Sequence, residues 1–253
     1  MDELLTVDLN CDLGESFGRY ELGQDAALMS SITSANVACG FHAGDPGVMR
    51  RTVQLAKQHN VSLGAHPGYP DLQGFGRRQI YFTPQEVRDI VIYQLGALAA
   101  FAAVEGVPLV HIKPHGALYN LASQDFITAK AIAQAVYDFD PNLILVGLAG
   151  SVLVKAGEEL GLKAASEGFP DRAYLPDGQL MPRSQEGAVI HQPEMVAANA
   201  LRLVQEGLII SGEEVKIDTL CLHGDNQNAA ENARILRQKL ESSGIEISPL
   251  INL

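Results

Sequence analysis

The stretch LTVDLNCD, residues 5–12, joins a short apolar run to polar residues that alternate with apolar ones. A similar arrangement, an apolar run that ends in ionisable residues, recurs at residues 35–45, 61–67, 109–116, 163–168 and 219–225. Short apolar runs predict buried strands, and the ionisable residues that follow them predict one shared polar edge. Repetition at the same end of successive strands is typical of the active face of a βα fold.

Helical segments separate these runs along the whole chain. We expect strands over 5–11, 35–39, 61–65, 109–113, 143–147, 163–166, 219–222 and 245–247, and helices over 26–34, 46–59, 84–104, 125–139, 151–160 and 228–242. Asp45-Pro46 and the capping box that begins at Thr83 are good helix starts. The alternation predicts an α/β fold, a TIM-like (β/α) barrel with seven or eight parallel strands, formed by residues 1–253 as one domain.

Composition excludes several classes of partner. The 253 residues carry a net charge of −12, which argues against binding to nucleic acid or to an anionic membrane. No secretory signal is visible, and the longest apolar stretch, residues 90–104, is short for a membrane span. Cys11, Cys39 and Cys221 lie in or beside strand-like runs, where we expect them to be buried thiols. We therefore expect a cytoplasmic protein.

Oxygen and imidazole side chains at the first three strand ends predict a metal site. Asp8, Asn10 and Asp12 alternate, so they share one side of a strand. Together with His42 and His66, the Asp12 carboxylate would suit Zn²⁺, Mn²⁺ or Mg²⁺. The alternative is that each histidine is a hydrogen-bonded structural residue, and the sequence leaves both possibilities open.

The cluster Lys113-Pro114-His115-Gly116 has a more specific composition. A lysine at a strand end can bind a carboxylate or phosphate oxygen, and a histidine beside it can move protons near neutral pH. In the structural alternative, the lysine extends from the rim and the backbone satisfies the histidine. His223-Gly224-Asp225 could repeat the arrangement, although Asp225 would equally well cap the helix that follows.

Further charged residues are expected around the same rim. Glu15 and Glu167 follow strands and could act as general acid or base. Arg77 and Arg183 lie in the long loops 67–78 and 171–189, where a guanidinium fits a carboxylate or phosphate. The sequence has neither a GxxxxGK[ST] nor a GxGxxG motif, so it offers no nucleotide site of its own.

Several of these motifs resemble the LamB/YcsF family. The resemblance is carried by residues 8–15, 34–45, 64–67, 75–77, 110–120 (with KPHGALYN), 182–185 and 221–225, in order and from end to end. Cys11 is a departure, since family members often have Ala there, and this small apolar exchange leaves the chemistry untouched. The resemblance implies a (β/α) barrel of the glycoside hydrolase/deacetylase type.

The resemblance also implies an activity. The family enzyme is an ATP-dependent 5-oxoprolinase, which cleaves 5-oxo-L-proline to L-glutamate together with two other subunits, B and C. Partner subunits that take part in ATP use would explain the missing nucleotide motif.

A mechanism follows as a hypothesis. Asp12 would be the base or a metal ligand, with His42 and His66 positioning water or a metal. Lys113 would hold the substrate carboxylate or a phosphoryl oxygen, and His115 would protonate the departing nitrogen. Glu15 completes the catalytic set, and substrate contacts are expected from Asn10, Arg77, Glu167, Arg183 and His223.

Two other functions stay open. The chain could be a metal-dependent deacetylase or amidase that acts alone, since Asp12 and two histidines on such a barrel would suit this chemistry. It could also be a non-catalytic subunit that binds a small acid for other chains. ATP dependence separates the first alternative from a 5-oxoprolinase, and the effect of Asp12→Asn on turnover separates the second.

Overall fold

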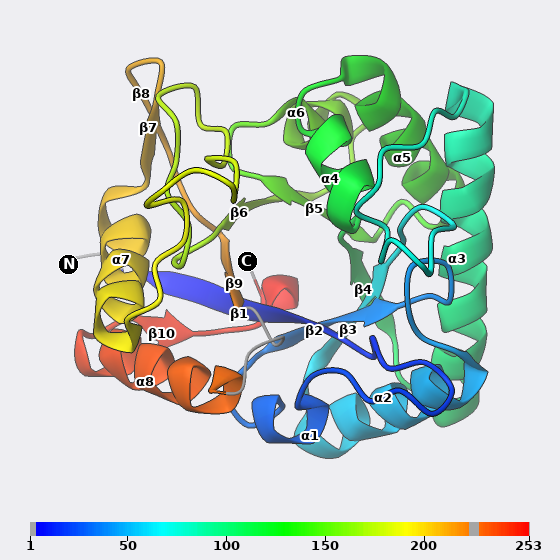
Figure 1. The fold of residues 1–253 in the computed structure, drawn as a ribbon, viewed down its shortest axis with the longest axis horizontal. Coiled ribbons are helices and arrows are strands. Elements are labelled where there is room, and N and C mark those ends of the chain that lie inside the picture. Colours follow the sequence, from blue (N-terminus) through cyan, green and yellow to red (C-terminus); the bar gives the residue numbers. More distant parts are fainter. Residues whose placement is uncertain (1–3, 223–227, 253) are drawn as a thin grey trace.

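A computed structural model describes residues 4–222 and 228–252 of the chain and has a closed parallel barrel at its centre (Figure 1). The barrel strands are β1 (Thr6–Leu13), β2 (Ser34–Ala38), β3 (Ser62–His66), β4 (Leu109–Ile112), β5 (Ile144–Leu148), β6 (Ala164–Gly168) and β9 (Thr219–Leu222). They pair in chain order, and β9 closes the barrel by pairing with β1. The short β10 (Glu246–Ile247) adds to the start of β1. The predicted α/β barrel of parallel strands is confirmed.

The alternation read from residues 5–12 sets the two faces of β1. Leu9 and Cys11 are fully buried in the main apolar cluster of the protein. Asp8 and Asn10 instead form hydrogen bonds with side chains of other strands, so they point into the barrel. The interior of this barrel is therefore lined by polar side chains along one face of β1.

The helices surround the barrel. They are α1 (Asp25–Leu28), α2 (Pro46–His59), α3 (Pro84–Glu105), α4 (Gly116–Ala122), α5 (Phe126–Phe139), α6 (Val152–Glu159), α7 (Pro193–Glu206) and α8 (Ala229–Ser242), with a final 3-10 turn over Leu250–Asn252. Asp45 accepts hydrogen bonds from the amides of Gly47 and Val48, and Thr83 forms the predicted capping box with Glu86. Both predicted helix starts are confirmed.

Helix α3 is the one helix in the described ranges that is long and apolar enough to cross a membrane. One of its faces, with Val91, Leu95 and Leu98, is buried in the apolar core, and the helix packs against α5. These contacts explain its composition, because a helix that covers a barrel needs a wide apolar stripe.

Four segments differ from the sequence prediction. The predicted helix 26–34 ends early, because the Thr33 hydroxyl bonds to Asp8 and Leu9 and the chain then enters β2. The predictions did not include α4 or α7. They also omitted the hairpin of β7 (Leu208–Ile210) and β8 (Glu213–Val215), which pairs outside the barrel.

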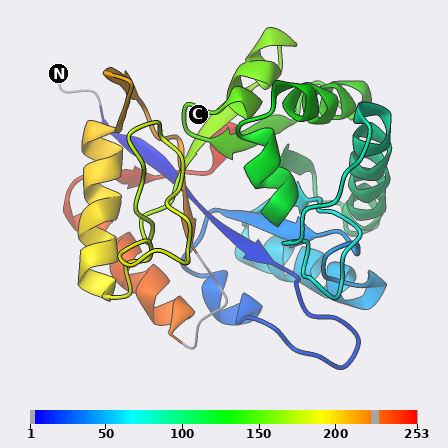
Figure 2. The same ribbon diagram turned by 45° about the horizontal axis from the view of Figure 1, so that its top comes forward.

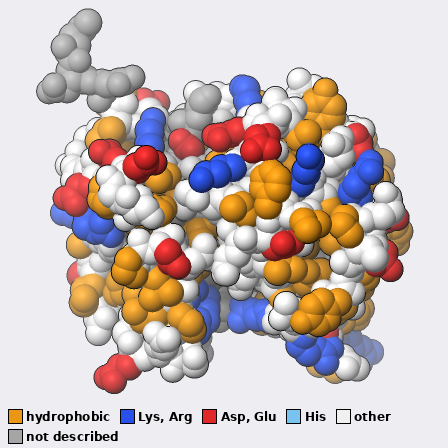
Figure 3. Space-filling view, turned by 90° about the horizontal axis from the view of Figure 1, so that it is seen from above, with side chains coloured by type: hydrophobic (Ala, Val, Ile, Leu, Met, Phe, Trp, Pro, Cys, Tyr) orange, Lys and Arg blue, Asp and Glu red, His pale blue; other side chains and the backbone are white. Residues whose placement is uncertain are grey.

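The two long loops lie at the carboxyl ends of the strands, on opposite sides of the barrel mouth (Figures 1 and 2). Buried Arg172 holds the loop between β6 and α7 together, because its guanidinium donates to the carbonyls of Met181 and Ala188. Acidic and basic side chains are interspersed over the described part of the face shown in Figure 3, with no single-sign patch there.

Candidate active site

A cavity of about 420 Å³ opens among the carboxyl ends of the strands. Its polar wall contains residues expected from the sequence, namely Asp12, Glu15, His66, Arg77, Lys113, His115 and Arg183. Its apolar wall includes Leu148, Phe169, Leu180 and Met181. A concave site with a few convergent polar groups and an apolar wall is the usual form of a small-molecule site.

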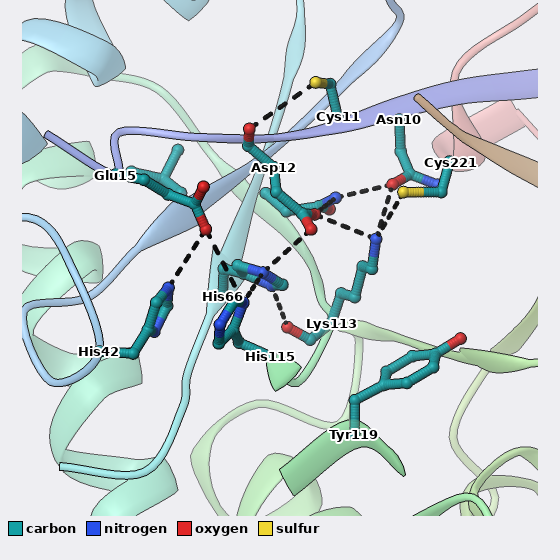
Figure 4. A network of polar contacts seen from close by, with 12 residues as sticks. Asn10, Cys11, Asp12, Glu15, His42, His66, Lys113, His115, Tyr119 and Cys221 are labelled. Atoms are coloured by element: carbon teal, nitrogen blue, oxygen red, sulfur yellow. Dashed lines mark hydrogen bonds and ion pairs between the residues drawn. The ribbon is translucent and has the colours of Figure 1, made fainter. Parts of the chain in front are cut away.

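Three histidines and one carboxylate meet at one side of this cavity (Figure 4). Glu15 follows β1, His42 follows β2, His66 ends β3 and His115 follows β4. One potential ligand atom from each of the four lies within 4.8 Å of all the others. We call Glu15, His42, His66 and His115 the histidine cluster.

Hydrogen bonds to the backbone fix the tautomers of two of these rings. His66 Nδ1 lies 2.7 Å from the carbonyl oxygen of Lys113, and His115 Nε2 lies 2.8 Å from that of Phe75. A carbonyl can only accept, so each of these nitrogens carries the proton. In the neutral rings the remaining nitrogens, His66 Nε2 and His115 Nδ1, carry lone pairs and face each other at 2.9 Å.

The third ring of the histidine cluster belongs to His42. His42 stacks on His115 with ring centroids 3.7 Å apart, and neither of its buried nitrogens has a hydrogen-bond partner among the described residues. His42 Nε2 lies 3.4 Å from the Glu15 carboxylate. Burial and the neighbouring His115 hold the pKa of His42 well below its usual range, and burial lowers the pKa of His115 to about 3. Imidazole nitrogens of His42, His66 and His115 thus converge with the Glu15 carboxylate, and nitrogen and oxygen atoms in such a group can hold a divalent cation.

Two glycines make room for the stacked rings of His42 and His115. At Gly76, where φ is +61°, an added Cβ would lie 2.7 Å from His42 Cβ and 2.9 Å from His115 Cδ2. At Gly68 it would lie 2.7 Å from His42 Nδ1. Both loop glycines are therefore required by the packing of the histidine cluster.

A second polar group surrounds the ammonium of Lys113, which is 3% exposed. Its Nζ lies 2.7 Å from Glu167 Oε1, 3.0 Å from Asp12 Oδ1 and 3.2 Å from both Asn10 Oδ1 and Cys221 Sγ. We call Lys113, Glu167, Asn10 and Cys221 the lysine cluster. Burial alone would lower the pKa of Lys113, but Asp12, Cys221 and Glu167 raise it well above the usual range.

Asp12 joins the two clusters. Its Oδ1 accepts from Lys113 and, at 2.8 Å, from Asn36 Nδ2, whereas its Oδ2 lies 3.3 Å from His66 Nε2. Burial would raise the pKa of Asp12, but the Lys113 ammonium, and His66 whenever its ring carries a second proton, hold it well below the usual range. Asp12 is thus an ionised carboxylate with one fixed oxygen and one oxygen that faces the histidine cluster and the cavity.

The structure brings together most of the residues expected at the site. Asn10 and Glu167 lie beneath Lys113, fully buried, and are not among the residues that line the cavity. Arg77 and Arg183 are on the cavity wall. His223 falls outside the described residues.

Asn36 and Tyr119 also belong to the site, and neither was among the residues predicted from the sequence. Asn36 is the one amide side chain in strand β2, whose other residues are small or apolar. This contrast is the feature of the sequence that could have indicated a role for Asn36. Tyr119 lies one helical turn after His115 and donates to Glu167 Oε2 at 2.7 Å.

Known proteins resemble this chain over nearly its whole length. A protein from Syntrophobacter fumaroxidans that bears the name of the 5-oxoprolinase A subunit is 55% identical, over 96% of this chain and 98% of its own. A protein of the same name from Bacillus subtilis is 51% identical over 98% of both chains. The crystal structure of the lactam utilization protein from Thermus thermophilus has a TM-score of 0.89 and 50% identity, and the match covers 96% of this chain and 99% of that one.

The match to a protein family also covers nearly the whole chain. The sequence model of the LamB/YcsF family matches residues 7–253, which include every described residue of both clusters. The resemblance noted from the motifs is confirmed: the chain belongs to the LamB/YcsF family.

Proposed function

We propose that this chain is the A subunit of an ATP-dependent 5-oxoprolinase and contributes the site at which the lactam ring is opened. The observation that carries the proposal is the identity of more than half of the residues, over nearly the full length, with proteins that bear this name. The cavity supports it, because ionisable groups line one wall and apolar side chains line the other, as a small cyclic acid requires.

The reaction needs activation because a five-membered lactam is a stable amide. Phosphorylation of the amide oxygen by ATP releases ADP and makes the ring carbon electrophilic. Water then adds to this carbon, and the carbon–nitrogen bond breaks as the nitrogen takes up a proton. A second water cleaves the resulting acyl phosphate to glutamate and phosphate.

Asp12 is the residue that we assign as the base for the attacking water. It is ionised, it lines the cavity, and Lys113 and Asn36 fix the oxygen that points away from the histidine cluster. Positioned general bases typically contribute about 100- to 10,000-fold in rate. The role of His115 as the acid stays a prediction, and its place in the histidine cluster favours a ligand role instead.

We propose further that the histidine cluster holds a divalent cation. Two features fit a cation better than any arrangement of protons on neutral rings: His66 Nε2 faces His115 Nδ1, and the His42 nitrogens have no hydrogen-bond partner in the described part of the chain. Glu15 and His115 thereby join the ligand set that the sequence predicted, and Asp12 lies beside it. When bound, such a cation would polarise an oxygen or lower the pKa of a bound water.

Metal content tests this assignment without an activity assay. We expect elemental analysis of the gently purified chain to find about one divalent cation per chain. His66→Ala and His115→Ala should each lower this content at least about tenfold, because each removes a ligand. The exposed His191→Ala is the matched control. Equal metal content in all three variants, or none in the parent chain, would remove the metal from the proposal.

We place ATP use largely on the partner subunits, since this sequence has no phosphate-binding loop. The relatives' name designates one lettered subunit and so indicates a multi-subunit enzyme; we propose subunits B and C as its other parts and the cytoplasm as its location. Glutamate release from 5-oxoproline, with and without ATP and the partners, tests the function. Activity only in the complete mixture supports it. ATP-independent cleavage by this chain alone would indicate the amidase alternative.

A further inference from the structure

Lys113 has no hydrogen left for a ligand. An ammonium group has three hydrogens, and Lys113 Nζ has three oxygen acceptors within 3.2 Å, on Glu167, Asp12 and Asn10. Cys221 Sγ is a fourth, weaker neighbour at 3.2 Å. With 3% of the side chain exposed, any substrate oxygen that reached this ammonium would have to displace a protein acceptor.

Glu167 is held as firmly as the lysine. Its Oε1 accepts from Lys113 and, at 3.0 Å, from Asn10 Nδ2, and its Oε2 accepts from the Tyr119 hydroxyl at 2.7 Å. The side chain is 0% exposed. Buried carboxylates are stable only when paired and hydrogen-bonded, and these three donors satisfy that condition.

These contacts form one chain that ends at Asp12, and Figure 4 shows its last link, between Lys113 and Asp12. Tyr119 fixes Glu167, Glu167 fixes Lys113, and Lys113 fixes Asp12 Oδ1. Tyr119 also lines the cavity, with its ring edge-on to Phe169 at 6.1 Å. The geometry therefore connects the cavity wall to the carboxylate that faces the histidine cluster.

We infer that Lys113, Glu167 and Tyr119 are positioning residues: they fix the orientation of Asp12, and Lys113 does not bind the substrate. This inference rests on the proposed function, and it replaces the substrate-binding role that the sequence predicted for Lys113. It also assigns Glu167 to the support of Asp12 and not to substrate contact. Small displacements of a reacting group are enough to lower rates about 100-fold.

The kinetic test separates positioning from substrate binding. In the complete complex, we compare Tyr119→Phe and the double variant Lys113→Met/Glu167→Gln, which removes both charges of the buried pair together. We expect kcat to fall about 100-fold in the double variant. In Tyr119→Phe, which loses one hydrogen bond, we expect a fall of about tenfold. KM for 5-oxoproline should stay within about threefold in both. Tyr137→Phe and Lys155→Met, both exposed, are matched controls.

Other outcomes overturn the inference. A KM that rises at least about tenfold with kcat retained would make Lys113 a substrate ligand. Unchanged kcat and KM would remove any role for the three residues.

A crystal structure of the double variant provides a readout that does not need turnover. We expect Asp12 Oδ1 to leave Asn36, and an unmoved Asp12 contradicts the inference. An inactive parent complex would instead contradict the proposed function and leave this structural comparison intact.

Discussion

The histidine cluster and the lysine cluster lie side by side at the same end of the barrel and share Asp12, yet they differ in hydrogen-bond balance. Around Lys113, each ammonium hydrogen has an oxygen acceptor, and Glu167 accepts at both of its oxygens. Among His42, His66 and His115, lone pairs face one another or have no partner in the described residues.

The difference separates two uses of buried polar groups. A satisfied network is complete without a ligand, so its role is to hold its members in place. An unsatisfied cluster carries a desolvation cost until something binds it, so it marks the place where a ligand belongs. By this comparison the histidine cluster binds a ligand, the lysine cluster positions its neighbours, and Asp12 contacts both clusters.

The largest expected effect is at the shared residue. Asp12→Asn keeps the shape of the side chain but removes the base, so we expect kcat of the complex to fall about 100- to 10,000-fold. Metal content and assembly with the partner subunits should be unchanged, as measured by elemental analysis and size-exclusion chromatography. A parallel loss of metal would move Asp12 into the histidine cluster as a ligand, and near-parental turnover would exclude it as the base.

Removal of the Lys113 ammonium should have the next largest effect, a loss of folding stability. Lys113→Met leaves Glu167 buried without its counter-ion, and broken buried pairs typically cost about 3–5 kcal/mol. We expect urea unfolding to show a loss of this size. Adding Glu167→Gln should restore much of it, because both charges are then gone. Equal losses in the single and double variants would mean that the lysine cluster is not a coupled network.

Much of this arrangement could be predicted from the sequence. Strand-end clusters indicated the carboxyl face of a barrel, because parallel strands bring their ends to one edge. Asp45-Pro46 and Thr83 indicated helix starts that the structure confirms. Helix α7 was predictable as well, since Pro193 begins an amphipathic segment with buried Ala200 and Leu203.

The division between the two clusters was not predictable. It depends on His66 bonding to the carbonyl of Lys113 and His115 to that of Phe75, contacts between residues 47 and 40 positions apart. Sequence spacing cannot specify which nitrogen of an imidazole ring carries the proton. The same limit applies to Lys113, whose burial beneath Asp12 changes its inferred role.

A smaller effect is expected at the floor of the barrel, where a third set of donors surrounds Asp8. The carboxylate accepts from the hydroxyls of Thr33, Ser34 and Thr219, yet burial raises its pKa to about 6. The folded state therefore keeps a proton that the unfolded state loses, and stability falls as the pH rises from about 4 through 6. This shift corresponds to about 3 kcal/mol.

Asp8→Asn isolates this contribution from that of His42, His111 and His115, whose lowered pKa values act in the opposite direction. The difference in unfolding free energy between the variant and the parent should change by up to about 3 kcal/mol between pH 4 and 7, with the parent losing relative stability. Urea unfolding at several pH values measures it. A difference that is constant with pH would mean that the three hydroxyls stabilise the ionised carboxylate fully.

The smallest expected effect is at the cavity wall. Arg77 lines the cavity beside His115, and its guanidinium lies 5.2 Å from the centre of the Phe75 ring. If Arg77 binds the substrate carboxylate, Arg77→Gln removes one charged hydrogen bond. KM for 5-oxoproline should then rise about tenfold, and kcat should stay nearly unchanged. Arg51→Gln, on the exposed side of α2, is the matched control. A fall in kcat without a change in KM would make Arg77 a positioning residue. The cavity wall would then contain positioning residues as well as residues that bind the substrate.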